Sequence, residues 1–209
     1  MSHLLSVLEK EIITYSSGLN PDQQYWKGAT WRQTIAKRHE IGNRKTPELS
    51  SGQIQDILKW GRITRFNGEA EYRAAIQDMD HGRIPGSRVY QSISSFSKLF
   101  SFHAPDRYFI LDARVAAALN HLIVKNRIEA PLYPFPPSRS RNKAISSLLK
   151  TTRSLGLYEY ENMGLAYVAY NDLIKIVHKR ISMAVPQPIR GKPEVVEMIL
   201  FVKALDYAQ

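Results

Sequence analysis

The chain has 209 residues, of which 44% are hydrophobic, enough for one globular domain with its own core and too many for a disordered chain. It carries 29 Lys and Arg against 19 Asp and Glu, a formal net charge of +10, which favours a polyanionic partner such as nucleic acid. The absence of cysteine excludes disulfides, thiolate metal sites and a cysteine nucleophile. No apolar run approaches the ~20 residues of a membrane span and no signal peptide is visible, so we expect a cytoplasmic protein that stays out of membranes.

Apolar residues recur at helical spacing through most of the chain, which predicts an all-α fold. The helices are expected, in chain order, at residues 4–15, in the twenties around Tyr25 and Trp26, and at 54–61, 69–79, 89–102, 113–125, 142–155, 158–182 and 194–205. The helix over 89–102 is expected to contain a turn near its start. Residues 80–86 should break the chain, and the proline-rich stretch 129–138 should form a rigid surface loop.

Asp112 is the residue in this pattern that most needs an explanation. It stands between the apolar pair Ile110-Leu111 and a run of good helix formers that begins at Ala113. This position predicts a helix N-cap, whose carboxylate accepts backbone N–H bonds and is kept ionised by the helix. In a partly buried setting the same carboxylate can stabilise a cationic transition state or activate a water. The structural and the catalytic interpretation are compatible.

Three blocks, Ser97–Phe102, Pro105–Val115 and Pro193–Phe201, resemble the helix-hairpin-helix superfamily of DNA glycosylases. The likeness spans roughly residues 53–205, with residues 1–50 as N-terminal helices on the same single domain. It implies a monomeric, two-lobed helical bundle that needs no metal or other cofactor. It matches Asp112 to the family's catalytic aspartate, which stabilises the oxocarbenium-like sugar as the base departs.

The family's hairpin, an apolar residue followed by Pro-Gly-Val-Gly, is missing. Ile84–Arg88 begins like it but lacks the second glycine, and the alternative position, Tyr90–Ile93, has no glycine. The backbone-amide clamp on a DNA phosphate is therefore weakened. We expect side chains such as Arg88 or Lys98 to replace it.

Lys98 lies on the helix that leads toward Asp112. Bifunctional members of the family use a lysine near the hairpin as an amine nucleophile that forms a Schiff base with the sugar. Lys98 is a candidate for that role, for a positioning role or for a phosphate contact. The alternative is a solvated lysine on a helix surface.

Basic residues alternate with aromatic ones in the stretch 59–66, as suits a nucleic-acid surface where charges meet phosphates and rings stack on bases. A second basic run, 139–153, contains no acidic residue. The alternative is that Trp60 belongs to the core and the cations are a solvated rim. The candidate DNA contacts are Arg62, Arg65, Arg88, Arg114, Arg139 and Arg141. The candidate base-pocket residues are Trp60, Tyr90, Gln91 and Tyr170.

Together these features predict a DNA glycosylase that flips a modified or damaged base out of double-stranded DNA and cleaves its N-glycosidic bond. The base, the setting (repair or defence against phage with modified DNA) and the presence of lyase activity all stay open. The rival functions are a non-catalytic DNA-binding module on a similar scaffold and a protein-interaction partner with a basic face.

Overall fold

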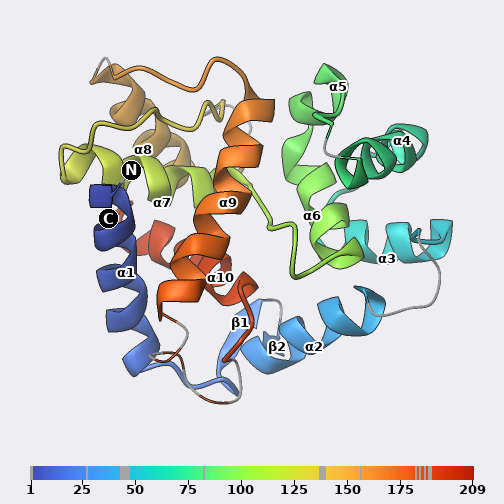
Figure 1. Cartoon of the computed structure of the whole chain (residues 1–209), viewed down its shortest axis with the longest axis horizontal. Coiled ribbons are helices and arrows are strands. Elements are labelled where there is room, and N and C mark those ends of the chain that lie inside the picture. The colour runs from blue at the N-terminus through green and yellow to red at the C-terminus, as the bar shows by residue number, and fades with distance from the viewer. Residues whose placement is uncertain are drawn as a thin grey trace.

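The computed structural model describes residues 2–26, 28–42, 48–81, 83–136, 140–155, 157–181, 183, 185, 187 and 190–209. Helices account for most of these residues, which confirms the all-α class (Figure 1). Every helix among them is too short or too polar to span a lipid bilayer. The helices are α1 (Ser2–Ser17), α2 (Trp31–Gly42), α3 (Ser51–Trp60), α4 (Glu69–Asp80), α5 (Ser87–Gln91), α6 (Ile93–His103), α7 (Ala113–Lys125), α8 (Lys143–Ser154), α9 (Met163–Ile181) and α10 (Glu194–Asp206).

The helix predicted around Tyr25 and Trp26 is wrong, because these residues lie in a small antiparallel hairpin. Strand β1 (Gln24–Trp26) pairs with β2 (Ala29–Thr30). Gly28 in the turn has φ +83°, a left-handed conformation that glycine adopts without strain. Gly28, two residues after Trp26, was therefore a local signal for the turn of this hairpin.

The helices pack in two groups around a shared apolar core. Helix α7 packs against α8 and α10, and α1 packs against α9, whereas α2 and α3 pack against α6. Figure 1 shows α3–α6 at one side of the molecule and α1 and α7–α10 at the other. The segment between α6 and α7 connects these groups, and it ends at Asp112.

Two of the predicted helices have different boundaries in the structure. The predicted helix over 89–102 is divided at Ser92 into α5 and α6, close to the expected turn. Helix α9 begins at Met163 instead of residue 158, because the chain before it pairs with Leu132, whose N–H donates to Tyr158 O at 2.9 Å. The proline-rich loop is also only partly a surface loop, since Tyr133 and Phe135 are buried.

The segment leading to Asp112 is buried but belongs to no helix or strand, so its peptide groups need partners from elsewhere. Side chains of three helices supply them. The N–H groups of Phe109, Ile110 and Leu111 donate to Asn171 Oδ1 (2.9 Å), Glu197 Oε2 (2.8 Å) and Ser97 Oγ (3.1 Å), respectively. These bonds from α6, α9 and α10 fix the path of the backbone up to the aspartate.

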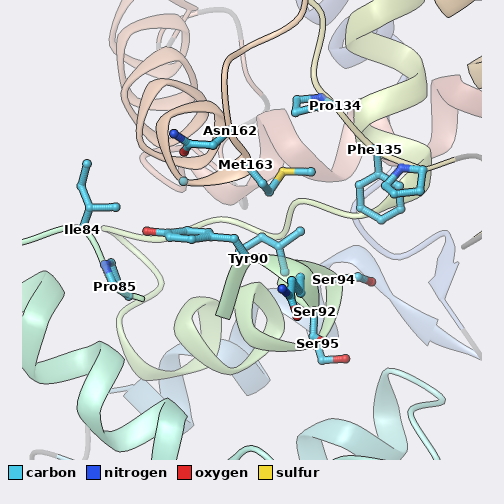
Figure 2. Close-up of a pocket in the computed structure, with 14 residues that line it drawn as sticks. Ile84, Pro85, Tyr90, Ser92, Ser94, Ser95, Pro134, Phe135, Asn162 and Met163 are labelled. Atoms are coloured by element: carbon cyan, nitrogen blue, oxygen red, sulfur yellow. The ribbon is translucent and has the colours of Figure 1, made fainter. Parts of the chain in front are cut away.

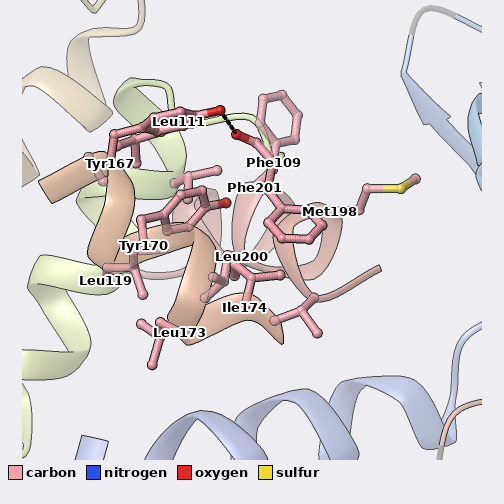
Figure 3. Close-up of a cluster of buried hydrophobic side chains, with 14 of the residues drawn as sticks. Phe109, Leu111, Leu119, Tyr167, Tyr170, Leu173, Ile174, Met198, Leu200 and Phe201 are labelled. Atoms are coloured by element: carbon pink, nitrogen blue, oxygen red, sulfur yellow. Dashed lines mark hydrogen bonds between the residues drawn. The ribbon is translucent and has the colours of Figure 1, made fainter. Parts of the chain in front are cut away.

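Two buried tyrosines of α9 hold the carbonyl groups of the same segment. Tyr167 donates its hydroxyl to Phe109 O (3.2 Å), the bond drawn in Figure 3, and Tyr170 donates to Ile110 O (2.9 Å). Tyr170 has no exposed surface and packs among the apolar side chains of the core. The prediction that Tyr170 lines a base pocket is therefore wrong, and its hydroxyl has a structural partner.

Candidate active site

A cavity of about 650 Å³ opens beside Asp112, where the ends of α3 and α7 meet β1 and one face of α6. We call it the Lys98 cavity. The side chains that matter for its chemistry are Trp26, Trp60, Arg62, Arg65, Ser94, Lys98, Asp112, Arg114, Arg141, Glu197 and Phe201. Its volume is in the range of small-molecule sites.

Asp112 is the N-cap of α7, as predicted. Its Oδ1 accepts the N–H groups of Arg114 (3.0 Å) and Val115 (3.2 Å), and its backbone is extended, with φ −124° and ψ −176°. The side chain is 16% exposed, and Oδ2 lies 3.9 Å from Lys98 Nζ. One carboxylate oxygen is thus used to anchor the residue, and the other faces the lysine in the cavity.

Lys98, on α6, lines the same cavity as Asp112. Its Nζ donates to Ser94 O (2.7 Å) and Ser94 Oγ (3.2 Å), and its side chain is 10% exposed. Burial lowers the pKa of Lys98 below its ordinary value, while the carboxylates of Asp112 and Glu197 oppose that shift. This lysine is therefore not the solvated surface residue of the alternative interpretation.

A buried ion pair lies beside the Lys98 cavity, and one of its members, Glu197, lines the cavity. Arg38 on α2 donates two hydrogen bonds to the carboxylate of Glu197 on α10, at 2.9 and 3.0 Å, and both side chains are almost fully buried. The same carboxylate accepts the Ile110 N–H at 2.8 Å. Burial raises the pKa of Glu197, and the Arg38 guanidinium opposes that shift. Glu197 therefore links the two groups of helices to the segment that carries Asp112.

Four of the six predicted DNA-contacting arginines line the Lys98 cavity: Arg62, Arg65, Arg114 and Arg141. Arg141 also donates to the backbone carbonyl of Arg62 at 3.3 Å, so the two lie at the same side of the opening. Arg88 is on α5 outside this lining and pairs with Glu71, and Arg139 lies outside the described residues. The arginines at the cavity come from three separate stretches of the chain.

Aromatic rings and arginines pack together at the cavity wall. The guanidinium of Arg114 lies 4.5 Å from the Phe201 ring centre and 5.6 Å from that of Trp26. Arg62 lies 5.8 Å from the Trp26 ring centre, and the Trp26 indole N–H donates to Trp60 O at 3.3 Å. Trp60 lines the cavity as predicted. Trp26 and Phe201 were missed because only the tertiary fold brings them to Arg114.

Tyr90 and Gln91, two predicted base-pocket residues, line a neighbouring cavity of about 850 Å³ (Figure 2). This Tyr90 cavity and the Lys98 cavity share Ser94, Ser95 and Phe135 in their linings. No charged side chain is among the described residues that line the Tyr90 cavity. The two cavities therefore adjoin, but the charged chemistry is confined to one of them.

The arrangement can support substitution at an electrophilic carbon. A buried amine with a lowered pKa is a candidate nucleophile, and a carboxylate beside it can stabilise positive charge that develops on a substrate. Comparisons of the chain with protein-family models, with curated proteins and with solved structures gave no match. The functional assignment therefore depends on this geometry and on the resemblance of the short sequence blocks.

Proposed function

We propose that the chain is a DNA glycosylase that removes a modified or damaged base from double-stranded DNA. The observation that carries the proposal is the Lys98–Asp112 pair at 3.9 Å in a cavity lined by four arginines. A polyanion would be drawn to such an opening, and the pair inside would meet any nucleotide turned out of the duplex. The proposal includes the two-lobed fold of the helix-hairpin-helix glycosylases and action as a monomer in the cytoplasm.

Asp112 would act on the sugar. As the N-glycosidic bond breaks, positive charge develops on the deoxyribose, and an ionised carboxylate in a largely buried site stabilises it. The N-cap bonds to Arg114 and Val115 hold Oδ1, so Oδ2 is the oxygen free to face the sugar. A fixed carboxylate needs little rearrangement during the reaction, which is what makes such stabilisation effective.

Lys98 would act as the nucleophile in a bifunctional mechanism. Its neutral amine attacks C1′, the C–N bond to the base breaks, and the base leaves with that electron pair and takes up a proton. The C1′–O4′ bond then breaks, O4′ keeps that electron pair and takes up a proton from the amine, and a protonated Schiff base remains between Lys98 and C1′. In a monofunctional mechanism water attacks C1′ instead, and Lys98 positions Asp112 through their close approach.

The arginines and aromatic rings would hold the DNA. Arg62, Arg65 and Arg141 are exposed at the opening, where each can meet a phosphate. Trp26 and Trp60 present rings on which an extruded base can stack. The absence of the glycine-rich hairpin in the sequence makes these side chains the main candidates for fixing the backbone.

The proposal is tested by incubating the purified protein with duplexes that each contain one modified base, including oxidised and alkylated purines and hypermodified pyrimidines. We expect abasic sites with at least one duplex and none with Asp112→Asn. Activity on damaged purines would point to repair, and activity on hypermodified pyrimidines to phage defence. An Asp112→Asn protein that folds and remains fully active would overturn the assignment.

A non-catalytic DNA-binding module is the second candidate, because the N-cap bonds alone explain the position of Asp112. This candidate predicts salt-dependent binding of DNA with no base release from any duplex. It also predicts that Asp112→Asn binds DNA as well as the wild-type protein. The same panel of duplexes, read by binding and by base release, separates the two candidates.

A further inference from the structure

A second group of side chains that can bind a metal ion lies on the same two helices as the Arg38–Glu197 pair. His39 follows Arg38 on α2, and Glu194 precedes Glu197 by about one helical turn on α10. With Asp106, in the turn after α6, they offer three ligand atoms that all lie within 4.8 Å of one another. None of these three side chains lines the Lys98 cavity.

Glu194 is unusual within this group. Its side chain has no exposed surface, and among the described residues only Oε1 has a partner, His39 Nε2 at 2.7 Å. Its other oxygen, Oε2, is buried without a hydrogen bond from the described residues. A buried carboxylate oxygen without a partner is costly unless a ligand satisfies it.

His178 on α9 shows the same deficiency. Its Nε2 is buried and has no hydrogen-bond partner among the described residues. His178 does not belong to the group of three ligand atoms that lie within 4.8 Å of one another, so it is not counted as a ligand.

We propose that His39, Asp106 and Glu194 bind one divalent transition-metal ion, for which Zn²⁺ is the best match. One imidazole and two carboxylates are ligand types that Zn²⁺ accepts, and a water would complete a tetrahedral set. Two ligand atoms on one tetrahedral Zn²⁺ lie about 3.3 Å apart, given bonds of about 2.0–2.1 Å. The His39–Glu194 contact would therefore open slightly, and Asp106 would close on the ion.

The charges around the site suit a dication. Glu194 and Asp106 contribute two carboxylates, and Arg38, which precedes His39 in the chain, is already paired with Glu197. The rival explanation is a simple His39–Glu194 hydrogen bond, in which Asp106 has no part. The two explanations differ in whether substitution of Asp106 changes any response to metal.

A bound ion would join α2, α10 and the turn that begins the path to Asp112. We therefore expect binding to stabilise the fold. Untagged, chelator-treated protein should unfold about 5–10 °C higher when Zn²⁺ exceeds its dissociation constant ~100-fold, and Mg²⁺ should have no such effect. After dialysis, the metal content should approach one Zn²⁺ per chain.

Two substitutions test the ligands without disturbing the core. Asp106 is exposed, so Asp106→Asn should fold normally and lose most of the Zn²⁺-induced shift, as should His39→Gln, which keeps a hydrogen-bond donor for Glu194. The matched control is His81→Ala, which removes an exposed histidine outside the cluster and should keep the full shift. No Zn²⁺-induced shift in the wild type, or an equal shift in all three variants, would overturn the proposal.

Discussion

Gly61, at the end of α3, lies directly against the side chain of Lys98. A Cβ placed on Gly61 would come within 2.7 Å of Lys98 Cδ and 3.2 Å of Cε. The backbone of Gly61 has φ −73°, a conformation open to any residue, so glycine is needed here for space alone. We predict that Gly61→Ala folds normally but displaces the amine, and lowers base release by about 10- to 100-fold.

The matched control is Gly52→Ala in the same helix. A Cβ on Gly52 would meet nothing within 4 Å. This substitution should stabilise α3 by about 0.5–1 kcal/mol and leave the reaction rate unchanged. Equal activity of the two variants, measured beside their unfolding curves, would show that Gly61 has no influence on the lysine.

The Arg38–Glu197 pair should dominate the stability of the site. Both side chains are buried, and Glu197 also satisfies the Ile110 N–H, so Glu197→Ala leaves a charge and a peptide group without partners. We predict a loss of about 3–5 kcal/mol in the free energy of unfolding, measured by urea denaturation. The exposed pair of Arg180 and Glu9 is the control, because Arg180→Ala should cost no more than about 1 kcal/mol. Similar losses for both pairs would contradict this account.

Much of the fold was predictable because its signals are local. The apolar approach to Asp112 followed by helix formers predicted both the N-cap and the bounds of α7, and these are confirmed. The β-hairpin was missed because tertiary contacts hold it: Trp26 packs edge-on against Phe201 at 5.3 Å between ring centres. Helical periodicity near Tyr25 carried no information about that distant partner.

The candidate site was predictable only in part. Asp112, Lys98 and Trp60 were identified from local pattern and resemblance, and the structure brings all three to one cavity. Tyr170 was misassigned because periodicity shows that a residue faces inward but cannot tell a cavity wall from a hydrogen bond to Ile110 O. The fit of Gly61 against Lys98 joins residues on different helices, which no local pattern reveals.

The buried amine of Lys98 predicts a distinctive pH dependence. Its pKa is lowered by burial, so Lys98 becomes neutral at a lower pH than an exposed lysine, whose pKa is about 10.5. If Lys98 is the nucleophile, single-turnover base release should rise with pH, with a midpoint below that value, and then level off. Borohydride should trap a protein–DNA adduct with the same pH profile. A monofunctional enzyme would give base release without the adduct.

The free energy of unfolding should also depend on the titration of Lys98, and the lowered pKa fixes the direction of that dependence. Between the lowered pKa in the folded protein and the ordinary value in the unfolded chain, the unfolded state binds more protons at Lys98. The contribution of Lys98 to stability therefore rises with pH between these two pKa values. At pH values below both, the full cost of burying the charged amine is present. Lys98→Met should remove this rise. The neighbours Asp112, Glu197 and Arg38 act on the same titration, so each variant is compared at matched pH.

The arginines at the cavity predict how DNA binding depends on salt. Arg141 is exposed beside the opening, so Arg141→Ala should weaken binding to duplexes of any sequence. If Arg141 meets one phosphate, the slope of log affinity against log salt should become shallower by about 0.9. Arg180→Ala, which removes another exposed cation, on α9, should leave the slope unchanged because Arg180 does not line the cavity. Fluorescence anisotropy across a salt series measures both slopes, and an equal change for the two variants would mean that DNA meets the general positive charge of the protein instead of this cavity.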